Sequence, residues 1–318
     1  MALERRLVYS FDNLVWAITG MDSETVGTST TSLMVPQTRE LQIQTLMDRF
    51  TNRRVPSYFS AVDEPCSMDD FNFTKVKSSE ELFQISFQNL DDCFGLIVAN
   101  ASPFMIGHSL IVPNPGELLN QSPLRLALQT ILLSADACLC LGFNSLLAHA
   151  SVNHLHFHLW YSTHRLFASI CPTRKKPSLP FYDELDSHPV DNFVLEFSTL
   201  EEFQVLFERF WVLVERCQEM KIAHNLFATR NITGALRVVL WPRRSVHGAK
   251  TCHRRPTSRD QCAPNVAVTE LAGMFVVPDE MHARPLSLPG GLHEIYVGER
   301  LDRREIEQLE ALLASSAI

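Results

Sequence analysis

The chain has 318 residues, 46% of them hydrophobic, and a formal net charge of −8. This length and composition allow a large buried core, in one large domain or two small ones. The negative charge argues against a protein that coats nucleic acid or lies on a membrane surface. An anionic nucleotide remains a possible ligand, because a local cluster of donors decides that.

The first residues lack the apolar run of a secretory signal, and no stretch of about twenty apolar residues follows. We therefore expect a soluble, cytoplasmic protein with no membrane partner. The 8 cysteines lie mostly in apolar surroundings and include no Cys-x-x-Cys pair, so reduced, buried thiols are expected.

Residues 1–70 are interpreted as an N-terminal extension. Within it, the polar stretch 20–32 predicts a mobile loop. Thr38–Arg54 predicts an amphipathic helix, because its apolar residues recur at helical spacing.

Residues 71–170 predict strands, one helix and more strands, which is typical of an α+β domain with an antiparallel sheet. A proline in the first turn of the helix is compatible with it, because that position needs no backbone donor. The predicted elements are strands Leu82–Phe87, Phe94–Ala99 and His108–Val112, helix Ser122–Cys140, a strand opened by Gly142–Ser145, and strand Asn153–Tyr161.

Residues 171–191 are rich in proline and predict an exposed connection to a second α+β half, residues 192–318. Because both halves show strands, a long helix and further strands, we predict a duplicated architecture in which one half carries the chemistry. Thr199 and Glu202 form a capping box at the long helix. The predicted elements are strand Phe193–Phe197, a helix from Thr199, strands Ile222–Ala228 and Leu236–Trp241, a surface loop Arg243–Gln261, helix Asn265–Ala272, strand Met274–Val277 and helix Asp302–Ala314.

The most informative feature is the run His154-Leu155-His156-Phe157-His158. On a strand, successive side chains point to opposite faces, so the three imidazoles share one face and the apolar residues share the other. Packing of the apolar residues would fix a row of groups that titrate near neutral pH. A purely structural interpretation would need a buried partner for each ring, so the row favours a catalytic site over a metal site.

The middle residue of the row, His156, is the best nucleophile candidate. A neutral imidazole nitrogen can attack an α-phosphorus and then pass the group to a second acceptor. His154 and His158 lie about 6–7 Å apart from it along the strand, close enough to contact the same phosphate. Charge on the phosphate oxygens also requires donors and a cation. The candidates for substrate binding are Asn144, Ser145, Ser151 and Asn153, with Lys250 chosen among the basic residues Arg237, Arg243, Arg244 and Lys250.

The row resembles that of the histidine-triad superfamily of nucleotide hydrolases and transferases. Gly107–Pro113 looks like the Gly-His-x-Leu-x-x-Pro strand of that superfamily. Other segments resemble its GDP-hexose phosphorylases, the animal GDP-D-glucose and plant GDP-L-galactose enzymes: Phe71–Lys75, Gly142–Ser145, Ser151–His156, Ile222–Phe227 and Asn265–Gly273. The resemblance implies an α+β fold with a histidine-triad-like antiparallel sheet flanked by helices.

The resemblance further implies that GDP-D-glucose and inorganic phosphate are the partners, and that the products are GDP and glucose 1-phosphate. In that family the middle histidine, here His156, carries a covalent GMP group. The family's chemistry requires no metal, and no cofactor is expected.

Two alternatives stay open. His158 stands where the plant relatives have glutamine, and histidine there is typical of hydrolases, so one alternative is a hydrolase that releases GMP. The other is a metal-binding or regulatory nucleotide-binding protein that uses the three histidines as ligands. The loop Leu146–Ala150 also lacks the glycines expected around a phosphate.

Overall fold

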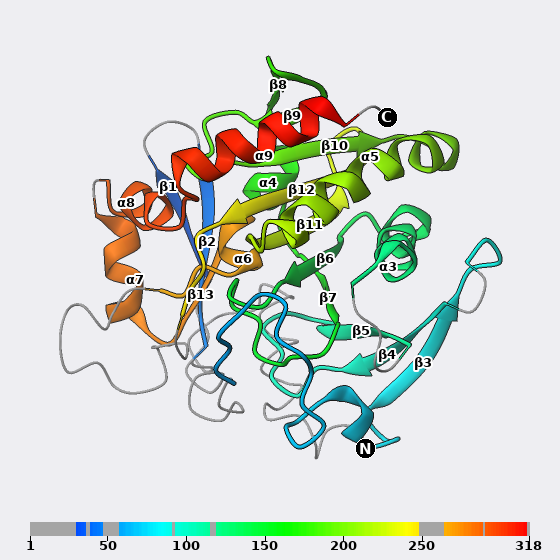
Figure 1. Cartoon of the computed structure of the whole chain (residues 1–318). Helices are drawn as coiled ribbons and strands as arrows, with labels where there is room; N and C mark the ends of the chain where they lie inside the picture. The colour runs from blue at the N-terminus through cyan, green and yellow to red at the C-terminus, as the bar shows by residue number, and fades with distance from the viewer. Residues whose placement is uncertain are drawn as a thin grey trace.

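The computed structural model describes residues 30–35, 39–46, 57–90, 93–114, 119–247, 264–288 and 290–316. The chain folds around a ten-stranded antiparallel sheet (Figure 1). Its strands are β3 (Glu81–Ser86), β4 (Phe94–Ala99), β5 (Ser109–Pro113), β6 (Leu139–Asn144), β7 (Phe157–Tyr161), β8 (Thr173–Lys176), β9 (Leu179–Leu185), β10 (Phe193–Phe197), β11 (Ala223–Arg230) and β12 (Leu236–Arg243). Across the sheet their order is β3-β4-β5-β7-β6-β11-β12-β10-β9-β8.

The sheet consists of two halves with the same topology. The chain order of the first half is β3, β4, β5, helix α3 (Gln121–Leu133), β6 and β7. The second half repeats it as β8, β9, β10, helix α5 (Leu200–Glu219), β11 and β12. In each half the last strand lies between the third and the fourth, and the two fourth strands, β6 and β11, pair at the centre. The predicted α+β fold with two related halves is therefore confirmed.

One face of the sheet is covered by α3, α5 and helix α9 (Arg303–Ser315), whose apolar residues form one cluster with those of the strands. Phe203, Phe207 and Phe210 of α5 are completely buried in it. Each such side chain contributes about 1.5–3 kcal/mol through burial. The predicted cap of α5 is present, because the hydroxyl of Thr199 accepts a hydrogen bond from the backbone N–H of Glu202 at 3.1 Å.

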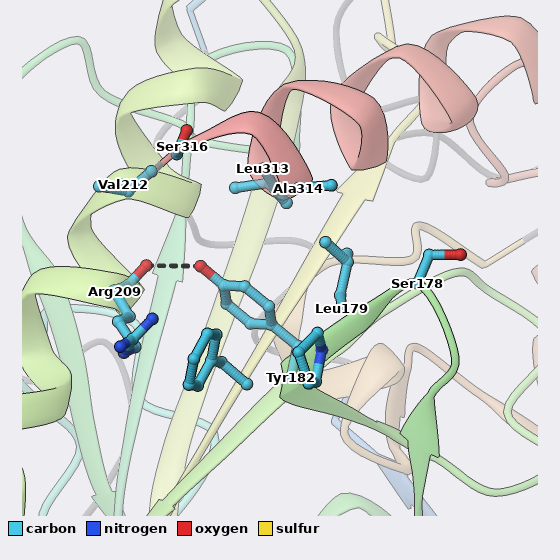
Figure 2. Close-up of a pocket in the computed structure, with 10 residues that line it drawn as sticks. Ser178, Leu179, Tyr182, Arg209, Val212, Leu313, Ala314 and Ser316 are labelled. Carbon is cyan, nitrogen blue, oxygen red and sulfur yellow. Dashed lines mark hydrogen bonds between the residues drawn. The ribbon is translucent and has the colours of Figure 1, made fainter. Parts of the chain in front are cut away.

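A cavity of about 130 Å³ lies between β9, α5 and the end of α9 (Figure 2). Tyr182 crosses it and donates a hydrogen bond to the backbone carbonyl of Arg209 at 2.6 Å. None of the residues that line this cavity is a histidine, so it lies apart from the predicted catalytic row.

The opposite face carries a second apolar cluster, over the second half of the sheet. There, Phe227, Val239 and Trp241 are buried beneath the covering elements. Strand β12 takes the place that β7 has in the first half, but it contains no histidine. The covering elements are a three-stranded sheet of β1 (Thr30–Val35), β2 (Arg39–Thr45) and β13 (Met274–Val277), with helices α4 (Phe167–Ile170), α6 (Val268–Leu271), α7 (Glu280–Ser287) and α8 (Gly291–Val297).

The predicted helix Thr38–Arg54 is wrong where the structure describes it. Residues 39–45 form β2, which pairs with β1 on one side and with β13 on the other. Ile43 of this strand is buried in the core, and pairing with two neighbouring strands overrides the apparent helical spacing. Residues 47–54 lie outside the described part of the chain, as do residues 20–29 of the predicted loop; residues 30–32 of that loop belong to β1.

The helix predicted to reach Cys140 ends at Leu133. Ser134 closes it with a turn, in which its hydroxyl accepts from the backbone N–H of Asp136 at 3.1 Å. Strand β6 then begins at Leu139, so the motif Gly142–Ser145 ends a strand instead of opening one.

The stretch 171–191, predicted as an exposed connection, supplies the two outermost strands of the second half, β8 and β9. Lys176 is buried there, with its ammonium 2.8 Å from the carboxylate of Glu310 and 3.1 Å from that of Glu184. Because these carboxylates compensate the charge of Lys176, the basic segment can form part of the sheet.

Two further expectations concern membrane-spanning helices and the cysteines. Within the described residues, no helix has the length and apolar character needed to cross a membrane. The six cysteines of the described residues are free: Cys93, Cys140, Cys171 and Cys217 are buried as expected, whereas Cys66 and Cys138 are exposed.

Candidate active site

The histidine row lies at the start of β7. His158 belongs to the strand and pairs with Leu110 of β5 and Gly142 of β6. His154 and His156 precede the strand, which begins at Phe157 and not at Asn153 as predicted. The intervening apolar residues Leu155, Phe157 and Leu159 lie in the core beneath the helices, so packing fixes this segment as predicted.

Two of the imidazoles are in contact with the ring of Phe73, for which the sequence predicted no role. The ring centroids of His156 and His158 are 5.1 Å apart. The ring of Phe73, from the short helix η1 (Phe73–Lys75), lies 5.5 Å from His154 and 5.0 Å from His156. His154 and His156 are buried, and His158 is half-buried.

The orientation of His156 fixes its tautomer. Its Nδ1 lies 2.7 Å from the backbone carbonyl oxygen of His154. A carbonyl only accepts, so Nδ1 carries the proton and donates it. In the neutral ring the lone pair is therefore on Nε2, which is the nitrogen available for nucleophilic attack.

His154 has the opposite tautomer. The backbone N–H of Phe73 donates to Nδ1 of His154 at 2.9 Å, so the ring proton is on Nε2. Burial lowers the pKa of His154, which keeps the ring neutral near physiological pH. His154 therefore presents an N–H donor beside the nucleophile.

His158 is oriented by a second histidine, His108. The backbone N–H of Phe104 donates to Nδ1 of His108 at 3.2 Å. Nε2 of His108 lies 3.0 Å from Nδ1 of His158 and 2.9 Å from Nδ2 of Asn100, which is a donor. His108 thus holds the ring of His158 in place.

The residue before His108 must be glycine. Gly107 has a φ of +62°, and an added Cβ would lie 2.6 Å from the ring of Tyr161. The sequence placed the motif Gly107–Pro113 on a strand without predicting a role for His108. The sequence signal for a role of His108 is that it directly follows this glycine.

The Nε2 atoms of His154 and His156 therefore differ in character: His154 presents an N–H group and His156 a lone pair. A nucleophile beside a donor suits displacement at phosphorus, because charge develops on the phosphate oxygens.

The predicted substrate-binding residues Asn144 and Ser145 hold the two halves together. Oδ1 of Asn144 accepts from Nδ2 of Asn225 at 2.6 Å and from the backbone N–H of Val268 at 3.0 Å. The hydroxyl of Ser145 accepts from the backbone N–H of His224 at 2.9 Å and donates to the carbonyl of Leu146 at 2.9 Å. These bonds give both side chains a structural role, and contact with substrate stays a prediction for them.

Ser151 and Asn153 connect the histidine row to residues 57–65. Nδ2 of Asn153 donates to the backbone carbonyls of Glu64 and Pro65, each at 2.9 Å. The carbonyl of Ser151 accepts from the backbone N–H of Ser57 at 3.4 Å. Lys250 lies outside the described residues.

Two of the predicted cations are buried and already paired. Arg243 donates to Oδ1 of Asn225 at 3.1 Å and forms an ion pair with Glu299, and burial lowers its pKa to about 9. Arg237 donates to Glu196 at 2.6 Å. Their internal partners compensate these charges, so among the described basic candidates Arg244 is the exposed one.

The structure also bears on the metal-binding alternative. Within the described ranges, no group of three or more histidine, cysteine, aspartate or glutamate residues is placed to hold a metal ion. The Nδ1 atoms of His154 and His156 are engaged with backbone groups. The geometry thus gives this alternative no support.

The fold is shared with solved structures of a nucleotide phosphorylase. Yeast Ap4A phosphorylase Apa2, in its complex with Ap4A, aligns with a TM-score of 0.60 at 15% identity, over 91% of this chain and 96% of that one. The uncomplexed yeast enzyme aligns with a TM-score of 0.53 at 16% identity, over 95% and 96% of the two chains. The chain accordingly has the histidine-triad-like α+β fold of nucleotide phosphorylases.

Sequence relatives narrow the family. A family model described as GDPGP1-like, N-terminal domain, matches residues 23–160. The chain is 34% identical over 256 residues to GDP-D-glucose phosphorylase 1 of Danio rerio, covering 76% of this chain and 71% of the relative. It is 34% identical over 280 residues to GDP-D-glucose phosphorylase 1 of Homo sapiens, covering 75% and 68%. The chain belongs to the GDP-D-glucose phosphorylase family.

Proposed function

We propose that this protein is a GDP-D-glucose phosphorylase, a nucleotidyltransferase that converts GDP-D-glucose and inorganic phosphate to GDP and D-glucose 1-phosphate. The names of its relatives support the substrate. The observation that carries the mechanism is the hydrogen bond from Nδ1 of His156 to the carbonyl of His154, because it directs the lone pair to Nε2.

In the first step, Nε2 of His156 attacks the α-phosphorus of GDP-glucose. A nitrogen–phosphorus bond forms, and the bond from the α-phosphorus to the bridging oxygen breaks. D-Glucose 1-phosphate leaves with the electron pair of that bond, and GMP stays on the histidine.

In the second step, an oxygen of inorganic phosphate attacks the same phosphorus. The nitrogen–phosphorus bond breaks, its electron pair returns to Nε2, and GDP leaves. His156 is regenerated with its proton on Nδ1, so the next turnover begins without a change of tautomer.

The two flanking histidines stabilise the charge in both steps. The Nε2–H group of His154 is the donor that we assign to the phosphate oxygens, and His158 is proposed to contact the same phosphate. Ser151, Asn153 and Lys250 are proposed to bind substrate beside them, and the proposed reaction uses no cofactor.

A hydrolase remains the second candidate, because His158 occupies the third position of the row. If water replaced phosphate in the second step, the products would be GMP and glucose 1-phosphate.

Product analysis separates the two functions. The purified protein is incubated with GDP-D-glucose, with and without phosphate, and the products are separated by chromatography. We expect equal amounts of GDP and glucose 1-phosphate that depend on phosphate. GMP as the sole nucleotide product under both conditions would establish the hydrolase instead.

Intact-mass measurement tests the nucleophile. After brief exposure to GDP-D-glucose without phosphate, the protein should gain the mass of one GMP group. His156→Asn should abolish the adduct, whereas His164→Asn, at an exposed position, should keep it. An adduct that survives His156→Asn would exclude His156.

A further inference from the structure

The loop formed by residues 68–75 lies against the histidine row, and the exposed Lys75 bridges its backbone. Nζ of Lys75 donates to the backbone carbonyls of Met68, Asp69 and Asp70, at 2.6, 3.1 and 2.6 Å. A lysine ammonium has three donors, and all three are used inside this loop. Lys75 therefore fixes the path of the backbone at the start of η1.

Asn72 fixes the other side of the same turn. It is 1% exposed and caps η1: its Oδ1 accepts from the backbone N–H of Thr74 at 3.1 Å and from the hydroxyl of Thr74 at 2.5 Å. This arrangement leaves the backbone N–H of Phe73 pointing away from the turn, and it meets Nδ1 of His154 at 2.9 Å.

The ring of Phe73 reinforces this contact. It is 8% exposed and lies against both His154 and His156. The segment thus contacts two of the three imidazoles, although 81 residues separate Phe73 from His154 in the chain.

We propose that residues 68–75 form a positioning loop, in which Lys75 and Asn72 hold the backbone N–H of Phe73 against Nδ1 of His154. This contact fixes His154 as a donor through Nε2 to the transferred phosphoryl group. Lys75 and Asn72 are positioning residues, because they act through Phe73 and His154. The role in phosphoryl transfer rests on the proposed function, whereas the control of the His154 tautomer does not.

The first variant is Lys75→Met, which keeps the length of the side chain and removes the three donors. Its matched control is Lys77→Met at the exposed lysine two residues further along. In protein labelled with ¹⁵N at the histidines, the ring nitrogens of His154 should show an unprotonated Nδ1 and a protonated Nε2. Lys75→Met should give averaged shifts, and Lys77→Met should leave them unchanged. The signals are assigned through their loss in His154→Gln.

Turnover is measured on the same variants. A displacement of catalytic groups by about 1 Å lowers rates by up to about 100-fold. We expect Lys75→Met to lower kcat by roughly 10- to 100-fold with little change in KM, because the donor acts on the transition state. The proposal is overturned if Lys75→Met matches Lys77→Met in both the ring shifts and kcat.

Asn72 provides a test that does not depend on the folding of Lys75→Met. Asn72→Asp keeps the oxygen that accepts from Thr74, whereas Asn72→Ala removes it. The aspartate variant should retain the His154 shifts and kcat, and the alanine variant should lose both. Equal behaviour of the two variants contradicts the positioning role. Intact His154 shifts in a protein that forms no glucose 1-phosphate would refute the proposed function alone.

Discussion

Protonation of the buried His224 should make the protein unstable in acid. His224 is 1% exposed, its Nδ1 donates to the carbonyl of Ile222 at 3.0 Å, and its Nε2 has no hydrogen-bond partner in the described structure. Burial lowers the pKa of this imidazole, and the bond to Ile222 opposes the shift in part. The folded protein therefore holds the ring neutral.

Proton binding to His224 favours the unfolded state. An unfolded histidine titrates near pH 6.5, while the folded one titrates lower, so the unfolded state binds more protons as the pH falls. The stability that this group supplies is complete above about pH 6.5 and is lost below it. The loss reaches at most about 1.4 kcal/mol per pH unit, until the pH falls to the folded pKa.

Urea unfolding followed by tryptophan fluorescence measures the effect between neutral pH and mildly acidic pH. His224→Leu removes the titrating ring, and its free energy of unfolding should fall less steeply with acid than that of the wild type. His164→Leu, at an exposed site, should keep the wild-type slope. Equal slopes for His224→Leu and the wild type would refute the reasoning.

Three further outcomes are expected. His108→Phe removes the ring nitrogen that meets Nδ1 of His158, so kcat for phosphorolysis should fall roughly 10- to 100-fold while the KM for GDP-glucose changes little; an unchanged kcat would show that His108 does not orient the row. Gly107→Ala adds a Cβ 2.6 Å from Tyr161 at a φ of +62°, and should destabilise the protein by about 1–3 kcal/mol in urea unfolding; Gly234→Ala, at a φ of +87° with no neighbour within 4 Å, should cost less. Glu299→Gln removes the charge that pairs with the buried guanidinium of Arg243, and should destabilise by about 3–5 kcal/mol; a midpoint equal to the wild type's would mean that other groups compensate this cation.

Local pattern predicted most elements of the large sheet. Strands β4 and β10 lie where alternation and apolar runs placed them, and Thr199 begins α5 because a capping box is a local signal. The segment 39–45 shows the limit. It is a strand because β1 and β13 pair with it, and that pairing is invisible from the segment itself.

The candidate site also has a part that can be predicted from local sequence and a part that cannot. The row His154–His158 is visible because its residues share one local segment. The groups that contact its outer rings are not: Phe73 is 81 residues from His154, and His108 is 50 residues from His158. For Asn144 and Ser145 the sequence displays donors and acceptors, but not the internal partners, Asn225 and the His224 backbone, that the structure gives them.

The repeated topology has a consequence for the stoichiometry of the proposed reaction. Of two equivalent strands, β7 carries His158 and directly follows His154 and His156, whereas β12 contains no histidine and its Val239 and Trp241 are buried beneath α6 and the neighbouring elements. A single polypeptide should then load one guanylyl group and never two. The other half of the sheet supports the reactive half, to which it is joined by the pairing of β6 with β11 and by the hydrogen bond between Asn144 and Asn225.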